Sequence, residues 1–140
     1  MQQILLAANV DADQPWLADA VAQLAKETGA GVAVLSVDEL ETEMLSTVPR
    51  SEVVQRAEQT ADATVQRLAA AGVQATKEVR SGRALDQILA YGDEHDVDLV
   101  VVGATSRGRL ASAILGSVPL SLVQRSKRPV LVVTDPASGG

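Results

Sequence analysis

The stretch VVVGATSRGRLASAILGSVPLSLVQRSKRPVLVV, residues 100–133, decides the fold. It begins as an apolar strand that ends at Gly103, passes through a loop of small and basic residues, and continues as a helix and a second apolar strand opened by Pro129. A strand, a glycine-containing loop and a helix together place backbone N–H groups and a helix N-terminus against a phosphate. We interpret the stretch as a nucleotide-binding site in a damaged or modified form. The rest of the chain then either builds this site or pairs two copies of it.

The composition indicates one domain, residues 1–140, of the α/β class. The chain has 140 residues, of which 46% are hydrophobic but only 1% aromatic. This length suits a single core, and a core of Ala, Val, Leu and Ile suits helices packed on a parallel sheet. The net charge of −6 disfavours nucleic acid and membranes as partners, although such a charge also serves solubility.

Two absences narrow the function classes further. The chain has no cysteine, which excludes disulfides, thiolate nucleophiles and cysteine-ligated metals. The first residues, MQQILLAAN, lack the basic and apolar regions of a signal peptide. No apolar run approaches the roughly 18 residues of a membrane span. We therefore expect a cytoplasmic protein.

Apolar runs alternate with helical patterns along the whole chain. Strands are predicted at residues 4–8, 31–37, 73–80, 98–102 and 129–134, and helices at 15–28, 49–71, 85–95 and 116–125, with an acidic loop at 38–47. This alternation predicts a doubly wound, five-stranded parallel sheet with helices on both faces. Ligands of such sheets bind beyond the carboxyl ends of the strands, where the winding reverses. The loops at 9–13 and 103–109 have the composition expected there.

The last strand suggests self-association. Val130–Val133 has no polar alternation, although the last strand of such a fold usually lies at a sheet edge. A bare apolar edge favours pairing with a second chain. We expect a homodimer joined through this strand, the alternative being a strand covered on both faces by helices.

Several residues near the glycine loop are candidates for anion binding. Gly103 and Gly108 permit close approach of the backbone, and Gly116-Ser117 begins a helix whose free N–H groups favour an anion. Arg107 and Arg109 are suited to phosphate oxygens. The alternatives are an ordinary helix cap and two solvated arginines.

Other polar residues give no catalytic site. His95 is the only histidine, and no nucleophile accompanies it, so we expect a solvated side chain. We expect Trp16 to cover the core at the start of the first helix. The run Glu39, Glu41 and Glu43 lacks a second ligand cluster, so no metal site is predicted. Neither an acid–base pair nor an activated nucleophile is evident.

The chain resembles the universal stress protein family of the adenine-nucleotide α-hydrolase-like group. The resemblance is carried by ILLAAN at 4–9, LAKETGAGVAVLSV at 24–37, DVDLVVVGATSRGRL at 96–110, ILGSV at 114–118 and RSKRPVLVV at 125–133. It implies a five-stranded parallel sheet in the order 3-2-1-4-5 and a dimer paired through the last strand.

The family's nucleotide motif, G-x2-G-x9-G-[ST], is present with one change. Gly103, Gly116 and Ser117 match, and Ser106 stands where the family has its second glycine. A serine there adds a Cβ and resists positive φ, but its hydroxyl can donate to a phosphate oxygen. Gly108 nearby relieves some of the crowding.

The resemblance also implies where a nucleoside would bind. Asn9 stands where family members that bind ATP usually have an aspartate, and it keeps an acceptor while losing the charge. Backbone groups at the position of Val37 read the adenine in those members.

By the same resemblance Gly103 holds the ribose side. Ser106, Gly116, Ser117 and Val118 take the phosphates with Arg107 or Arg109, and a Mg²⁺ bridges phosphate oxygens.

The resulting hypothesis is a cytoplasmic, homodimeric stress-response sensor or regulator that binds ATP, or alternatively ADP or AMP. The runner-up is a family member that has lost the nucleotide and acts through a protein partner, towards which Ser106 and Asn9 both point. A third class is an enzyme with slow ATP hydrolysis or self-phosphorylation, which the lack of a clear base disfavours.

Overall fold

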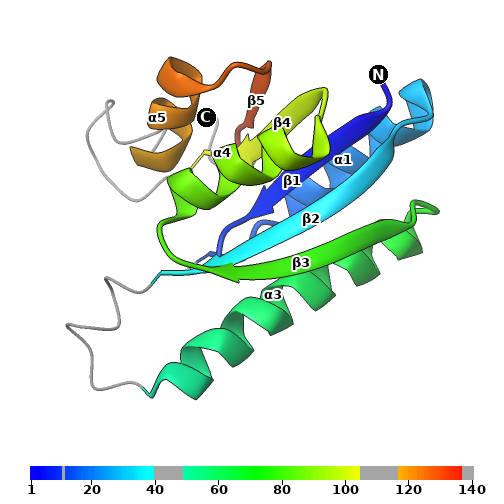
Figure 1. Ribbon diagram of the computed structural model, residues 1–140. Helices are drawn as coiled ribbons and strands as arrows, with labels where there is room; N and C mark the ends of the chain where they lie inside the picture. Colours follow the sequence, from blue (N-terminus) through cyan, green and yellow to red (C-terminus); the bar gives the residue numbers. More distant parts are fainter. Residues whose placement is uncertain (11, 40–48, 105–116, 137–140) are drawn as a thin grey trace.

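The computed structural model contains a five-stranded sheet with helices on both faces (Figure 1). It describes residues 1–10, 12–39, 49–104 and 117–136. The strands are β1 (Gln3–Ala8), β2 (Gly31–Asp38), β3 (Ala75–Ser81), β4 (Leu99–Gly103) and β5 (Val130–Val133), and the helices are α1 (Pro15–Thr28), α3 (Arg50–Ala70), α4 (Ala84–His95) and α5 (Ser117–Arg125). All strand pairs are parallel, in the order β3-β2-β1-β4-β5. The predicted fold class and strand order are confirmed.

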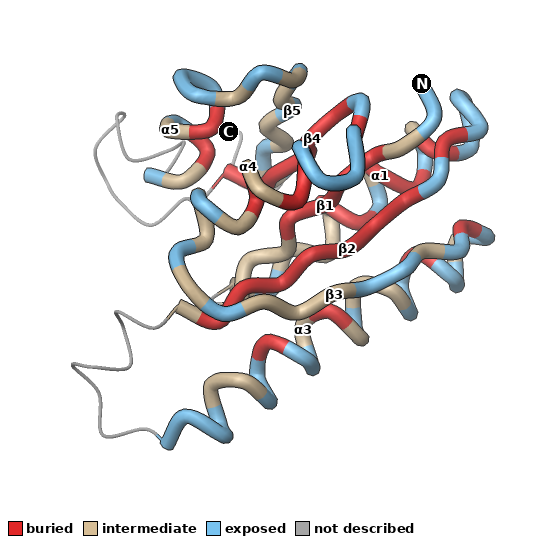
Figure 2. The backbone as a smooth tube through the Cα atoms, in the orientation of Figure 1, coloured by how far each residue is buried: buried red, intermediate tan, exposed pale blue. Residues whose placement is uncertain are grey.

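The strand β1 lies at the centre of the sheet and is apolar on both faces. Ile4, Leu5 and Leu6 are at most 1% exposed, and the strand pairs with β2 on one edge and with β4 on the other. Figure 2 shows the buried residues concentrated along β1, β2 and β4. An uninterrupted apolar run is what a parallel strand covered by helices on both sides requires.

Two apolar clusters form the core, one on each face of the sheet. Leu6 packs with Leu17 and Val21 of α1 and with Leu68 of α3. Its neighbour Leu5 packs on the opposite face, in the cluster that includes Leu35 of β2, Ile88 of α4 and Leu122 of α5. Successive residues of a strand point to opposite faces, so a single strand supplies both clusters.

Small side chains let α3 approach the sheet closely. Ala57 and Ala61, one helical turn apart, are fully buried against it. Ser36 of β2 is also fully buried, and its Oγ donates a hydrogen bond to the carbonyl oxygen of Ala57 at 2.8 Å. A polar side chain is therefore satisfied inside an aliphatic layer.

The boundary of β2 differs from the sequence prediction. Asp38, predicted to open an acidic loop, is the last residue of β2 and is 2% exposed. Its backbone oxygen accepts a hydrogen bond from the N–H of Gly82 at 2.9 Å, and it is paired with Ser81 at the end of β3. Pairing with the edge strand extends β2 by one residue. The strand β3 lies at the sheet edge, as predicted, but begins at Ala75 and not at Val73, because the N–H of Val73 donates to the carbonyl oxygen of Leu68 at the end of α3 and pairing with β2 starts at Ala75.

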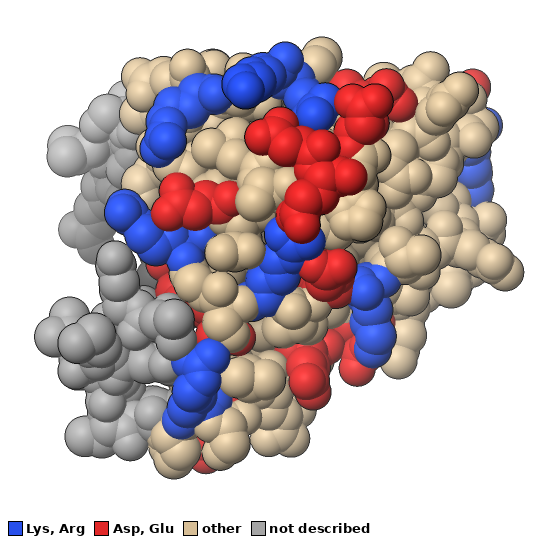
Figure 3. Space-filling view, viewed as in Figure 1, with Lys and Arg blue, Asp and Glu red and all other residues tan. Residues whose placement is uncertain are grey.

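Oppositely charged residues interleave on the face of the molecule that carries α4 and β3 (Figure 3). Arg80 donates to Glu94 at 2.7 Å, also pairs with Glu78, and lies over the ring of Tyr91 with its Cζ 5.1 Å from the ring centroid. His95 is exposed and stacks on Tyr91. Within the described residues, no helix is both long and apolar enough to cross a membrane.

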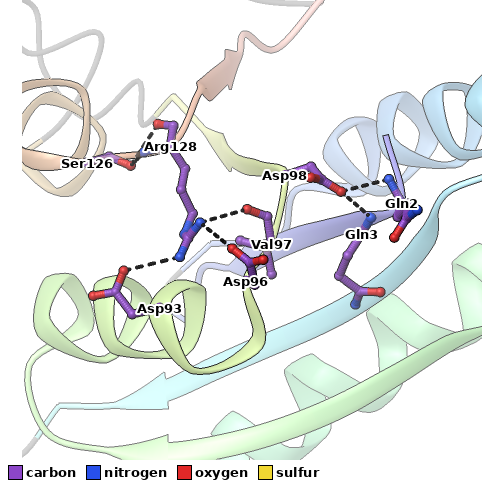
Figure 4. A network of polar contacts seen from close by, with 8 residues as sticks. All are labelled: Gln2, Gln3, Asp93, Asp96, Val97, Asp98, Ser126 and Arg128. Atoms are coloured by element: carbon purple, nitrogen blue, oxygen red, sulfur yellow. Dashed lines mark hydrogen bonds and ion pairs between the residues drawn. The ribbon is translucent and has the colours of Figure 1, made fainter.

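Polar contacts at the amino end of the sheet tie the chain's first residues and the β5 entry to the fold (Figure 4). One carboxylate oxygen of Asp98 accepts hydrogen bonds from the backbone N–H groups of Gln2 and Gln3, at 2.7 and 2.9 Å. These two bonds lower the pKa of Asp98. Arg128, just before β5, reaches Asp96 at 3.2 Å and Asp93 at 3.4 Å.

We predict that Asp98 makes the protein's stability depend on acid pH. Because its pKa is lower in the folded chain than in the unfolded one, the ionised carboxylate stabilises the fold at neutral pH. This contribution disappears as the pH falls through the folded pKa. Asp98→Asn should lower the denaturation midpoint at pH 7, and the difference from the native protein should close on acidification. Denaturant unfolding at several pH values measures this difference. Glu58→Gln, which removes an exposed carboxylate of α3, is the control and should leave the midpoint unchanged. A difference between Asp98→Asn and the native protein that persists at acid pH would contradict the prediction.

Candidate functional site

The strands that lead into the two loops singled out in the sequence end side by side at the carboxyl end of the sheet. Ala7 of β1 lies opposite Val102 of β4, and these neighbouring strands are the point where the winding reverses. Asn9 follows directly after β1, and Gly103 is the last residue of β4. Strands one and four are thus neighbours, as the strand order implied by the resemblance requires. This is the position where ligands bind in open α/β sheets.

The third predicted nucleoside residue, Val37, lies at the same edge. Ala8 of β1 is opposite Ser36 of β2, so Asn9 and Val37 are the next residues along the two strands. Val37 is 8% exposed, and its side chain belongs to the core cluster on the α4 and α5 face. Its side chain is therefore taken up by the core, and the backbone role that the resemblance implies stays a prediction.

Of the residues predicted to bind phosphate, the two that the structure describes lie at the start of α5. Ser117 is the first residue of this helix and is exposed, and Val118 packs partly against the core cluster on the α4 side. The other predicted phosphate residues, Ser106, Arg107, Gly108, Arg109 and Gly116, lie outside the described residues. The site is therefore defined here by its nucleoside side and by the start of α5.

Gly103 is closely packed against the start of α1. A Cβ at this position would lie 2.5 Å from Oε1 of Gln14 and 2.9 Å from the Cη2 atom of the Trp16 ring. Real Cβ atoms do not approach other atoms so closely. The glycine that opens the nucleotide motif thus also admits two side chains of the chain itself. Trp16 packs against the core as predicted.

Gln14 is a site residue that the sequence analysis missed. Its Nε2 donates a long hydrogen bond of 3.4 Å to the backbone oxygen of Ala104, the residue after β4. Its Oε1 is buried and has no partner among the described residues. A buried acceptor without a donor is energetically costly. The only sequence signal is its place directly before Pro15, which begins α1.

A second buried polar group, also missed, lies at the carboxyl ends of β2 and β3. Ser81 donates a hydrogen bond of 2.6 Å to one carboxylate oxygen of Asp38. The other oxygen lies 3.5 Å from a guanidinium nitrogen of Arg50, which begins α3 and also donates to Ser81 at 2.8 Å. The cluster fixes the start of α3 to the sheet. Its sequence signal was a charged residue that directly follows an apolar run.

Acidic and histidine side chains do not gather into a metal site in the described part of the chain, where no group of three or more was found. The described site therefore offers backbone groups, an amide and a helix N-terminus. This donor set suits a nucleotide, whose base and phosphates are bound by such groups.

Comparison with known proteins identifies the family. The model of the universal stress protein family matches residues 1–134. The chain belongs to the universal stress protein family. Among curated relatives, a universal stress protein of Mycobacterium tuberculosis is 38% identical over 52 residues, and one of Methanocaldococcus jannaschii is 32% identical over 65 residues. These matches cover 37% and 46% of this chain, and only 36% and 38% of the relatives' own lengths.

Solved structures of the family share the fold. A universal stress protein from Archaeoglobus fulgidus superposes with a TM-score of 0.76 at 20% identity, covering 94% of this chain and 98% of that one. The Archaeoglobus protein in complex with dAMP gives 0.71 at 20% identity, with 94% and 97% covered. A universal stress protein in complex with cAMP gives 0.67 at 23% identity, with 95% and 96% covered. At these identities the likeness establishes the fold.

We predict that Gly103→Ala destabilises the protein even without a ligand. The added methyl group must displace both the Gln14 amide and the Trp16 ring, and overpacking of this kind costs about 1–3 kcal/mol. Chemical denaturation measures the loss. In a Trp16→Leu background the same substitution should cost less, because the rigid one of the two obstructing groups is gone and the Gln14 side chain can rotate away. An equal cost in both backgrounds would show that this contact is not what requires glycine at position 103.

Proposed function

We propose that this universal stress protein binds an adenine nucleotide at the carboxyl edge of its sheet and acts as a cytoplasmic sensor or regulator of the stress response. The observation that carries the proposal is the convergence of Asn9, Val37 and Gly103 where the winding reverses. The dAMP and cAMP complexes of two proteins of this fold support the same ligand class.

In this proposal each residue acts through a group suited to one part of the nucleotide. The amide of Asn9 and the backbone at Val37 hold the nucleoside, and the backbone at Gly103 faces the ribose. The free N–H groups at Ser117 and Val118, which begin α5, receive the phosphates together with Ser106, Gly108, Gly116 and an arginine of the loop, Arg107 or Arg109. The ligand is ATP, or alternatively ADP or AMP, and Mg²⁺ is held through phosphate oxygens.

Ser117→Asp tests the phosphate end of the proposed site. Aspartate is favourable at a helix N-terminus, so the variant should fold, while its charge repels a phosphate bound there. We expect calorimetric titration with ATP and Mg²⁺ to show at least a tenfold loss of affinity, and a smaller loss for AMP, which carries less charge. Ser51→Asp, the same change in the exposed first turn of α3, is the matched control and should bind as the native protein does.

The outcomes of this titration separate the two candidate functions. Micromolar binding by the native protein, around −8 kcal/mol, that is unaffected by Ser117→Asp would place the ligand elsewhere. Binding by Ser106→Gly alone would show that the serine in the motif prevents it. If neither the native protein nor Ser106→Gly binds ATP, the nucleotide proposal is wrong.

The second candidate function, action through protein contacts, is favoured by the apolar surface of α5 and β5. β5 is an edge strand paired only with β4. Leu131 on β5 is 40% exposed, and Leu120 and Val123 on α5 are 44% and 55% exposed. These are three of the four exposed large apolar side chains in the described chain. We propose that this edge, Val130–Val133, pairs with a second copy to form a homodimer, and that a dimer presents the surface to which other proteins bind.

Lysine at this edge should abolish the dimer. Leu131→Lys with Val123→Lys places two charges on exposed positions where the folded monomer tolerates them but an apolar interface does not. Sedimentation velocity at micromolar concentration should show a dimer for the native protein and a monomer for the variant. A native protein that sediments as a monomer would refute the edge-strand argument.

A further inference from the structure

A groove on the α1 and α3 face of the sheet has the size and lining of a second ligand site. It has a volume of about 510 Å³, within the range of small-molecule sites. Its lining comes from the end of β1, the β1–α1 connection, the first turns of α1, and one side of α3 from Arg56 to Arg67. Figure 1 shows α1 behind the sheet and α4 in front of it, so the groove and the side chain of Val37 lie on different faces.

The floor of the groove is aliphatic. Its base is formed by almost fully buried side chains, and the apolar surface that a ligand can contact comes from the half-buried Ala8, Val10 and Pro15. Ala63 of α3 contributes a methyl group to the wall. The floor therefore suits an apolar body, whose burial from water supplies the binding energy.

The cations of the groove differ at its two ends. Arg67 is held by Asp19 of α1 through two hydrogen bonds of 2.8 and 2.9 Å, and this contact raises the pKa of Arg67. The carboxylate of Asp13, which also lines the groove, raises it further. This end is thus electrostatically satisfied.

Arg56 provides the contrast. It lies eleven residues before Arg67, about three helical turns or 16 Å away on the same side of α3. Within the described chain no carboxylate pairs with its exposed guanidinium, whereas Arg50, Arg80 and Arg128 each contact an aspartate or glutamate. In a chain of net charge −6, this arginine at a groove is positioned for an anion from outside.

The hydroxyl groups between the two arginines have no hydrogen left to donate to an anion. Thr60 and Thr64 donate their hydroxyl hydrogens to the backbone oxygens of Arg56 and Thr60, at 3.0 and 2.8 Å. Their donors are therefore used, so the anionic group of a ligand has its partner at Arg56 and not along the middle of the groove.

We propose that this groove binds a small amphipathic organic anion, with its acidic group at Arg56 and its apolar body on Ala8, Val10 and Pro15. This site is separate from the proposed nucleotide site, although Asn9 lies on the border of both. The ligand class is an acid of one negative charge, such as a carboxylate or sulfonate, with a hydrocarbon body that fits about 510 Å³.

The probe for the test is 8-anilinonaphthalene-1-sulfonate, an apolar dye with one sulfonate group, followed by fluorescence titration of the full chain. We expect one binding event that octanoate displaces and octylammonium does not. Arg56→Gln should weaken dye binding about tenfold, because it removes a charge-assisted hydrogen bond. Arg83→Gln, the same change at an exposed arginine directly before α4, is the matched control and should have no effect.

A second variant tests whether the dye binds in the groove without changing any charge. Ala63 is exposed on α3, so Ala63→Phe should fold, and its ring should fill the groove and remove dye binding. Dye binding that survives both Arg56→Gln and Ala63→Phe but is lost in Val123→Lys would assign the dye to the surface of α5 and overturn the proposal. Displacement of the dye by AMP would assign the groove to the nucleotide and overturn it equally. A failure of nucleotide binding alone leaves the expected dye result unchanged.

Discussion

The burial of β1 on both faces is the constraint on which the rest of the structure depends. A strand with apolar side chains on both sides and partners on both edges needs a helix layer above and a helix layer below. The chain meets this need by placing α1 and α3 on one face and α4 and α5 on the other. The change of face occurs where β4 pairs with β1, and in sheets of this kind a ligand binds beyond the carboxyl ends of the two strands at that change. The candidate site is thus a consequence of how the central strand is covered.

Most of the fold could be predicted because its signals are local. Continuous apolar runs specified the strands other than β3, an alternating pattern specified β3, and Pro15 and Pro49 marked where α1 and α3 begin. The errors concern the ends of elements, and the one at Asp38 is set by contacts distant in sequence. Asp38 belongs to β2 because Ser81 and Gly82, more than forty residues later, bind it. No local pattern distinguishes such a buried carboxylate from the first residue of an acidic loop.

The candidate site was predictable to a smaller extent. The resemblance to the family located Asn9, Val37 and Gly103, and strand pairing brings them to one edge. The role of Gln14 was not predictable, because its amide contacts Ala104 across ninety residues of sequence. The packing of Gln14 and Trp16 against Gly103 also means that the glycine at this position has two explanations. A glycine in a nucleotide motif is read as room for a ligand, whereas here the space beside it is filled by the chain's own side chains. A motif match and a packing requirement can therefore select the same residue.

The hydrogen bond from Ser36 to the carbonyl oxygen of Ala57 has a mechanical consequence. Aliphatic side chains on a smooth sheet resist separation, but they resist sliding weakly, since one methyl contact replaces another as a helix moves along its axis. A single directional bond has one position of best geometry. This hydrogen bond therefore opposes sliding of the long helix α3 along its own axis. Within the core it acts together with the surface contacts of Arg50 and Arg67, which hold the same helix at its two ends.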